Sequence, residues 1–260
     1  MLPAQRPRAA DKQGPRATDR REGDAVPTDF GASRLDGITL LSPLTAEERA
    51  AVARRCRWRR FHANEQIIGH QGDSRDVVLV VEGRVRVLSH SPAGREISFD
   101  DIEAGGFLGE MAAIDGLPRS ASAVALEDGT QIAFLAPQPF QDLVSGHPAL
   151  AMTVMKRLCR VVRIATDRVM ELSTLGANNR VHAELLRLAK RGRMEGGAAV
   201  IAPIPVHADI ASRVSTARET VARVLSDLAR DGLVERRPDA LVVHDLKRLE
   251  ALVEDVRTGA

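Results

Sequence analysis

Residues 106–124 read GFLGEMAAIDGLPRSASAV, and this stretch decides how the first half of the chain is interpreted. Gly109 permits a close backbone approach, Glu110 can accept hydrogen bonds from a sugar hydroxyl, and Arg119 offers a planar fork that suits a phosphate. Ser120 adds a hydroxyl donor, and a short turn or helix after Gly109 would present free N–H groups to an anion. Together these residues predict a site that holds a cyclic phosphate ester.

The sequence around this stretch is typical of a β-sandwich or barrel. Short β-branched runs, each bounded by Gly or Asp turn signals, recur through residues 61–136. Upstream, Thr45 followed by Glu47 and Glu48 predicts the start of one short helix. The predicted strands are 66–69, 77–81, 85–89, 97–99, 120–125 and 131–135.

A long helix is predicted after Pro148, because about twenty-five residues follow without Gly or Pro. Apolar residues recur on it at steps of three and four, which favours pairing with a second copy of the chain, although packing on its own barrel would give the same pattern. Gly176 ends the run and predicts a hinge before a further helix. The repeating positions are Val154, Leu158, Val161, Ala165, Val169, Leu172 and Leu175.

A second motif lies at residues 208–230, ADIASRVSTARETVARVLSDLAR. It divides into a short helix, a turn near Ser215 and a longer helix, which is helix-turn-helix geometry. Arg218, Glu219 and Arg223 would lie on the N-terminal part of the second helix, where a major-groove reader places its base contacts. Gly232-Leu-Val and the following ERRPDALVVHD predict a turn and a two-stranded wing.

Charge and composition narrow the classes of protein. Acidic residues predominate in 61–145 and basic residues in 180–237, so the second region would attract phosphate backbones. The two cysteines are too few for a disulfide scaffold, an iron-sulfur cluster or an all-cysteine zinc site. The chain lacks an apolar run of membrane-spanning length and a signal peptide, so we expect a cytoplasmic protein without a membrane partner.

Both motifs resemble those of the bacterial catabolite activator protein and fumarate-nitrate regulator (CRP/FNR) superfamily over residues 38–245. The resemblance implies an α+β fold with a jelly-roll-like, cyclic-nucleotide-binding β-barrel, a long dimerisation helix and a winged helix-turn-helix DNA-binding domain. The predicted division is a disordered tail at 1–34, the barrel at 35–147, the helix at 148–175, the DNA-binding domain at 176–250 and a tail at 251–260.

The same resemblance assigns the ligand-binding residues. Gly109 and Glu110 would contact the ribose and phosphate, Arg119 the phosphate charge, and Ser120 with the next backbone amide would complete the cradle. Two consecutive hydroxyl residues meet the adenine in this family, whereas the chain has Ala165 and Thr166. The predicted ligand-binding set is Gly109, Glu110, Met111, Arg119, Ser120, Ala121 and Thr166.

The resemblance also implies a function, a homodimeric transcription regulator that binds double-stranded DNA under the control of cyclic AMP. Its predicted DNA-binding residues are Thr216, Arg218, Glu219 and Arg223, and RNA polymerase is an expected partner. At the turn, family members often have Gly where this chain has Ser215. If that position has positive φ, Ser costs on the order of 1 kcal/mol.

The sequence fits other functions less well. The alternative within the family is a regulator whose pocket is empty or holds another ligand. A redox sensor would need an N-terminal cysteine cluster, which residues 1–55 lack, and no histidine spacing singles out a haem ligand. The sequence has no nucleophile elbow, P-loop or HExxH motif and leaves no room for an enzyme domain, so neither an enzyme nor a metal site is expected.

Overall fold

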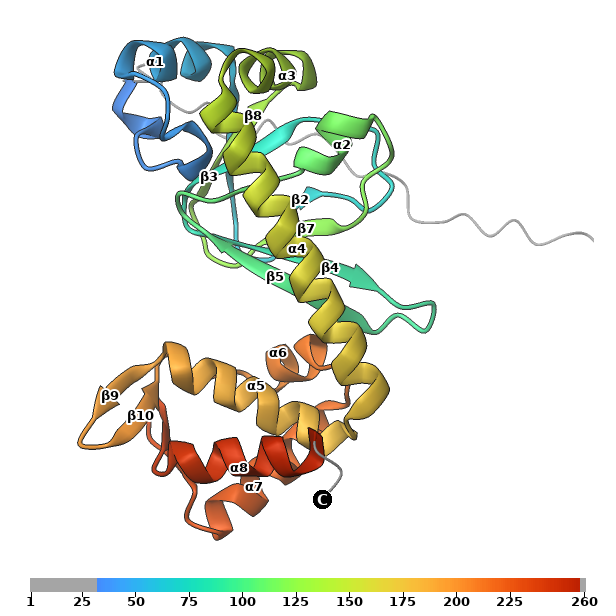
Figure 1. Ribbon diagram of the computed structural model, residues 1–260, viewed down its shortest axis with the longest axis vertical. Coiled ribbons are helices and arrows are strands. Elements are labelled where there is room, and N and C mark those ends of the chain that lie inside the picture. Colours follow the sequence, from blue (N-terminus) through green and yellow to red (C-terminus); the bar gives the residue numbers. More distant parts are fainter. Residues whose placement is uncertain (1–31, 258–260) are drawn as a thin grey trace, which may run out of the picture.

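A computed structural model describes residues 32–257. Figure 1 shows a β-rich half and a mainly helical half, joined by one long helix that crosses between them. The predicted tail at 1–34 lies outside the described residues except for its last three, which begin a 3-10 turn. Arg34 in that turn donates to Oε1 of Gln131 at 3.3 Å, so the predicted boundary was wrong at that residue.

The first helix begins where the sequence predicts. The Thr45 hydroxyl accepts a hydrogen bond from the Glu48 amide at 3.2 Å, and the Glu48 carboxylate accepts one from the Thr45 amide at 2.8 Å. This reciprocal capping box satisfies two N–H groups that a helix start leaves free. The N-terminal elements are η1 (Ala32–Leu35), η2 (Thr39–Leu41) and α1 (Ala46–Arg55).

Two four-stranded sheets form the β-rich half, in the orders β1-β8-β3-β6 and β2-β7-β4-β5. All paired strands are antiparallel, and the sheets face each other in a jelly-roll-like sandwich without closing into a barrel. The six predicted strands are present, whereas β1 and β6 were not predicted. The strands are β1 (Arg57–Phe61), β2 (Gln66–Ile68), β3 (Val77–Glu82), β4 (Arg84–His90), β5 (Glu96–Glu103), β6 (Phe107–Leu108), β7 (Ser122–Ala125) and β8 (Thr130–Leu135).

Strand β8 explains how the sandwich is held to its helices, because all six of its residues are buried. Ile132 and Phe134 point into the space between the sheets, and Ala133 and Leu135 pack against the helices on the outer face. Successive side chains of a strand point to opposite faces, so a strand buried on both sides carries apolar residues on both, as β8 does from Ile132 to Leu135.

One short helix, α2 (Glu110–Asp115), lies between β6 and β7, and two helices, α3 (Pro137–Gly146) and α4 (Pro148–Thr174), follow the last strand of the sandwich. Helix α4 has 27 residues, of which only Leu150 and Val154 are buried. Leu158 packs partly against the core of its own domain. The face predicted to meet a second copy is therefore used in part within the chain, while other apolar side chains of α4 are exposed, namely Met152, Met155, Val162, Val169, Met170 and Leu172.

The C-terminal half contains the predicted helix-turn-helix and wing. Its sheet has the order β11-β12-β10-β9, and the β9–β10 hairpin was not predicted. The predicted tail at 251–260 was wrong through residue 257, because α8 covers it and buries Leu249 and Val253. The elements are α5 (Ala177–Arg191), β9 (Arg193–Glu195), β10 (Ala198–Ile201), α6 (His207–Arg213), α7 (Arg218–Arg230), β11 (Val234–Arg236), β12 (Leu241–Val243) and α8 (Leu246–Arg257).

Candidate functional site

Gly109 shapes the cassette at residues 106–124. It has φ of +86° and precedes α2, whose N-terminus it caps. A Cβ at this position would lie 2.5 Å from Nη1 of Arg119 and 3.0 Å from the carbonyl oxygen of Asp76. Both the backbone conformation and the lack of space therefore require glycine.

Arg119 is held by the backbone around it and is only 4% exposed. Its Nη1 donates to the carbonyl of Gly109 at 3.1 Å, and its Nη2 donates to the carbonyl of Asp76 at 2.6 Å and to the Ser74 hydroxyl at 3.3 Å. Burial lowers the pKa of the guanidinium. Its Nε–H is buried and, among the described residues, has no acceptor.

Glu110 is buried beside a second arginine that the sequence did not predict. Nε of Arg157, on α4, lies 3.8 Å from the Glu110 carboxylate, and Nη1 of Arg157 donates to Asp100 at 3.1 Å. Burial raises the pKa of Glu110, and the nearby positive charges of Arg157 and Arg119 oppose that shift. Within the described chain, Nε of Arg157 is also buried without a hydrogen-bond acceptor.

A cavity of about 620 Å³ lies between the cassette, the β4–β5 hairpin and α4. Six predicted ligand residues line it, while Thr166 is exposed and lies outside the lining formed by this chain. The helix contributes Arg157, Val161, Ile164, Ala165, Arg168, Val169 and Leu172 to the wall. The six predicted residues that line the cavity are Gly109, Glu110, Met111, Arg119, Ser120 and Ala121.

Arg157 and Arg168 are functional candidates that the sequence interpretation missed. The residues of α4 that line the cavity follow one another at steps of one, three and four, which is the spacing of one helix face. An arginine at the start of this face and another near its end interrupt an otherwise apolar stripe. That interruption was visible in the sequence and could have identified both.

The helix-turn-helix presents its predicted base readers to solvent. Arg218, Glu219 and Arg223 are exposed on α7, whereas Thr216 is 8% exposed and its amide donates to the carbonyl of Ala211 at 3.0 Å. Thr216 is therefore placed as a turn residue. Ser215 has φ of +52°, so this turn does take the left-handed conformation that favours glycine.

Two arginines lie close to the start of α6, beside the recognition helix α7. The pKa of His207, which begins α6, is lowered by partial burial and further by the charges of Arg236 and Arg218. Arg180 of α5 fixes the turn, because Nε donates to the carbonyl of Val214 at 2.9 Å and Nη2 to that of Ser215 at 3.3 Å. These features suit a rigid module that approaches a phosphate backbone.

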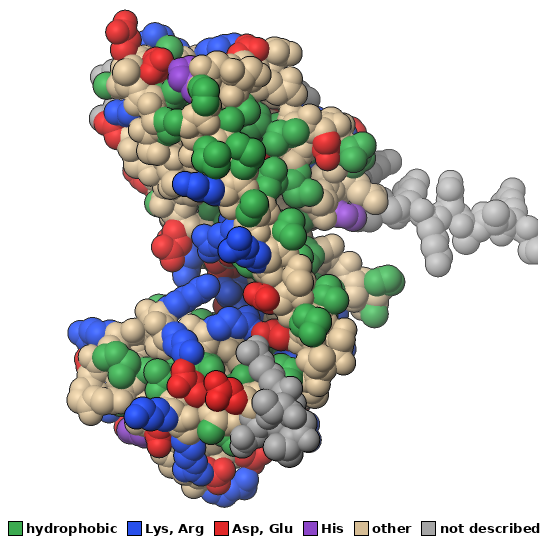
Figure 2. All heavy atoms as spheres, in the orientation of Figure 1, with side chains coloured by type: hydrophobic (Ala, Val, Ile, Leu, Met, Phe, Trp, Pro, Cys, Tyr) green, Lys and Arg blue, Asp and Glu red, His purple; other side chains and the backbone are tan. Residues whose placement is uncertain are grey.

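A second hollow lies at the waist between the two halves, where Lys and Arg side chains gather (Figure 2). It has a volume of about 1110 Å³ and is lined by both acidic and basic residues. In residues 32–257, no three His, Cys, Asp or Glu side chains cluster as metal ligands would. No helix in that part of the chain is long and apolar enough to span a membrane.

Comparisons with known proteins agree with this arrangement. Residues 58–147 match the family model of the cyclic nucleotide-binding domain, and residues 179–252 match that of the Crp-like helix-turn-helix domain. The chain is 33% identical over 204 residues to the cyclic AMP receptor protein of Thermus thermophilus, covering 77% of this chain and 88% of that protein.

Solved structures give the same result. A variant of CooA from Carboxydothermus hydrogenoformans superposes with a TM-score of 0.72 at 25% identity, covering 82% of this chain and 95% of the other. A CRP/FNR family regulator from Thermus thermophilus has a TM-score of 0.59 at 29% identity, covering 76% and 98%. Two motifs, two domain matches and these relatives show that the chain belongs to the CRP/FNR superfamily of DNA-binding transcription regulators and carries a cyclic nucleotide-binding domain.

Proposed function

We propose that this regulator binds cyclic AMP in the 620 Å³ cavity and that the nucleotide controls its affinity for DNA. Its site would comprise the six cassette residues that line the cavity, with Thr166 able to reach the ligand only from a second copy of the chain. We also propose that it acts as a cytoplasmic homodimer and that RNA polymerase is its partner at promoters.

The observation that carries the proposal is a pair of buried, unsatisfied donors. The Nε–H groups of Arg119 and Arg157 have no acceptor among the described residues, and both side chains line the same cavity as Glu110. A buried donor without a partner costs about 1–3 kcal/mol, which an anionic ligand would recover. A cyclic phosphate supplies the acceptors, and Glu110 can accept from the ribose hydroxyl.

The exposed apolar residues of α4 support the homodimer. Met152, Met155 and Val162 are 48–63% exposed on one helix, together with Met170. Large apolar side chains gathered along one helix are typical of a surface that a partner covers. In the dimer, the nucleotide would move the hinge at Gly176 and reposition the two recognition helices, provided that it binds the DNA-competent arrangement more tightly.

Calorimetry on the full chain tests the ligand. Cyclic AMP is expected to bind the wild type, and Arg119→Lys should weaken binding about tenfold to a hundredfold, because an ammonium cannot replace the planar fork. Arg95→Lys is the matched control, since Arg95 is exposed on the β4–β5 hairpin and does not line the cavity.

The outcomes separate the two functions that the residues allow. Binding of cyclic AMP that is weakened in Arg119→Lys and unchanged in Arg95→Lys supports the proposal. If cyclic GMP binds instead, the effector is a different cyclic nucleotide. If neither produces heat and the protein still selects DNA sites, the chain is a regulator whose DNA binding does not depend on a cyclic nucleotide.

A further inference from the structure

One arginine of α4 touches both the ligand cavity and the DNA-binding module. Arg168 lines the cavity, and its Nη1 donates to the carbonyl of Ser98 on β5 at 2.6 Å. Its Nη2 donates to the carbonyl of Ser212 at 3.2 Å and to that of Arg213. These last two carbonyls belong to the C-terminal turn of α6, where a cation is favoured by the helix dipole.

One residue of the helix-turn-helix reaches the wall of the cavity. Ser215, the turn residue with positive φ, lines the cavity together with Leu172 and Phe99. The guanidinium of Arg168 lies 5.8 Å from the centre of the Phe99 ring. A ligand that extends along α4 from Arg157 toward Arg168, about 16 Å along the helix, would therefore meet the DNA-binding module directly.

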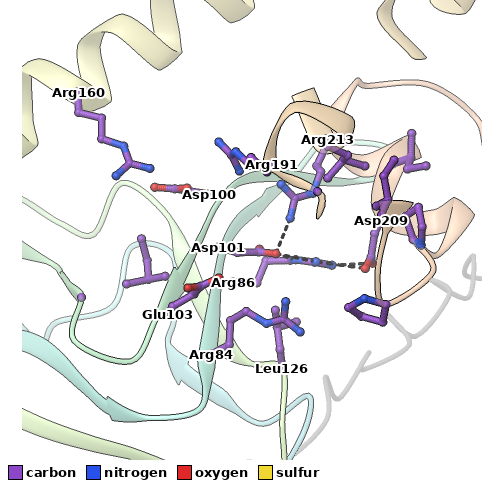
Figure 3. A pocket seen from close by; sticks show the side chains of 18 of the residues that line it. Arg84, Arg86, Asp100, Asp101, Glu103, Leu126, Arg160, Arg191, Asp209 and Arg213 are labelled. Carbon is purple, nitrogen blue, oxygen red and sulfur yellow. Dashed lines mark hydrogen bonds and ion pairs between the residues drawn. The ribbon is translucent and has the colours of Figure 1, made fainter. Parts of the chain in front are cut away.

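Other ties between the two halves lie outside the ligand cavity. In Figure 3, Arg86 of β4 lies between Asp101 of β5 and Asp209 of α6, at 2.9 Å and 2.6 Å. Arg213 of α6 also pairs with Asp101. Neither Arg86 nor Asp209 lines the ligand cavity. The docking of α6 on the sandwich thus has one tie that a ligand can reach and another that it cannot.

We propose that Arg168 is the positioning residue through which the nucleotide acts on the DNA-binding module. A purine base at the Arg168 end of the cavity accepts a hydrogen bond from the guanidinium. The hydrogen bonds from Arg168 to the carbonyls of Ser212 and Arg213 weaken as this contact forms. This inference rests on the proposed function. It means that the nucleotide controls the DNA-binding module at the contact between Arg168 and the turn after α6, in addition to the hinge at Gly176.

The chemistry of the cavity wall around Arg168 supports this role. The helix wall around Arg168 is apolar, with Ile164, Ala165, Val169 and Leu172. Within one chain, the polar edge of a base at this part of α4 would therefore have no partner on the helix unless Arg168 supplied one. Arginine can donate to N7 of either purine, and to both N7 and O6 of guanine. A ligand shifts a conformational equilibrium only by binding two states differently, and competition for one guanidinium supplies that difference.

Three variants of the full chain test the inference. Arg168→Met removes both the proposed contact with the base and the hydrogen bonds to Ser212 and Arg213. Asp209→Asn removes only the ion pair with Arg86, and Arg163→Met is a control. Arg163 is an exposed arginine of α4 that lines neither hollow. Calorimetry gives the affinity for cyclic AMP and cyclic GMP. DNA titrations with and without saturating nucleotide give the coupling ratio, which is the DNA affinity with nucleotide divided by the DNA affinity without it.

The expected results have opposite signs. Arg168→Met should lower nucleotide affinity about tenfold, as loss of a hydrogen bond to a charged group does, and should bring the coupling ratio toward one. Asp209→Asn should raise nucleotide affinity, because weaker docking of α6 leaves Arg168 free for the ligand. Arg163→Met should change neither quantity.

Other results would overturn the inference. If Arg168→Met binds nucleotide as tightly as the wild type, or more tightly like Asp209→Asn, Arg168 is only a structural tie. Arg168→Lys keeps the charge and should give an intermediate affinity, so it decides the question if the Met variant does not fold. If the wild type binds neither nucleotide, the proposed function fails as well, which is a distinct result.

Discussion

The ligand cavity and the recognition helix use arginine in opposite ways. Arg119 and Arg168 are held by three acceptors each, which are backbone carbonyls except for the Ser74 hydroxyl. Arg218 and Arg223 are exposed on α7, and within residues 32–257 neither side chain makes a hydrogen bond or an ion pair. The cavity presents charges that hydrogen bonds hold in place, whereas the recognition helix presents charges without such contacts.

This difference shows how the two sites differ in what binding requires of their side chains. A small anion is recognised by groups that are already in place, because ordering them at the moment of binding would cost affinity. DNA is recognised by side chains that adjust to a groove and to its phosphates. Changes in the cavity should therefore affect folding and ligand binding together, and changes on α7 should affect DNA binding alone.

The largest expected effect is on the fixed side of this comparison. Gly109→Ala should lower the free energy of unfolding by about 3 kcal/mol and abolish nucleotide binding, because of its positive φ and the close Arg119 guanidinium. Gly116→Ala is the matched control, since Gly116 has φ of +71° with nothing within 4 Å of its Cβ. It should cost about 1 kcal/mol in urea unfolding. Equal losses would contradict the steric argument.

On the recognition helix α7, Arg223→Ala should weaken binding to a selected DNA site by about 1–3 kcal/mol and remove the preference at one base pair. The protein's fold should not change, since Arg223 is exposed. Selection from random duplexes at fixed salt measures this. Arg230→Ala, at the C-terminal end of α7, should leave every base preference intact. Retention of the wild-type preferences in Arg223→Ala would refute base reading by this residue.

The turn between α6 and α7 offers a smaller effect of opposite sign. Ser215→Gly should stabilise the protein by about 0.5–1 kcal/mol, because glycine adopts positive φ without strain. Ser226→Gly, within α7, should destabilise it by a similar amount, since glycine weakens a helix interior. Chemical unfolding of both variants tests the pair. Destabilisation by Ser215→Gly would show that its side chain matters more than its backbone.

The smallest expected effect concerns an exposed ion pair in the β-rich half of the molecule. Nε2 of His147 lies 3.2 Å from the Glu48 carboxylate, which raises the pKa of His147 above 6.5 and, after the Thr45 amide, helps to lower that of Glu48 below 4.5. The stabilisation from His147 is full below its unfolded pKa and is lost as pH rises through its folded pKa. The stabilisation from Glu48 is lost as pH falls through the folded pKa of Glu48.

His147→Gln should therefore lower the melting temperature most between about pH 4.5 and 6.5, and hardly at all above pH 8. Melting curves of both proteins across this range measure the difference. A difference that does not depend on pH would mean that the ion pair contributes nothing.

The sequence predicted the parts of the fold that have strong periodicity or turn signals. The six predicted strands, the α1 capping box and the helix-turn-helix all follow from local patterns. Strand β1 was missed because its sequence, RWRRF, is mostly charged, and only its pairing with β8 makes it a strand. Tertiary pairing overrides local preference in such segments.

The candidate site was predicted as far as one contiguous motif reaches. Six cassette residues line the cavity, because they lie within a single loop and helix start. Arg157 and Arg168 come from α4, and Phe99 comes from the β4–β5 hairpin, so only the fold brings them to the cassette. The buried position of Thr216 likewise depends on packing that a motif does not describe.

Helix α4 has a consequence for how much of the protein is active in a cell. Only Leu150 and Val154 of its 27 residues are buried within one chain, and helices in proteins owe most of their stability to such packing. If a second copy covers the exposed apolar side chains, the order of α4 depends on protein concentration by mass action. The number of copies that the cell makes would then set the response to effector as directly as the amount of effector does.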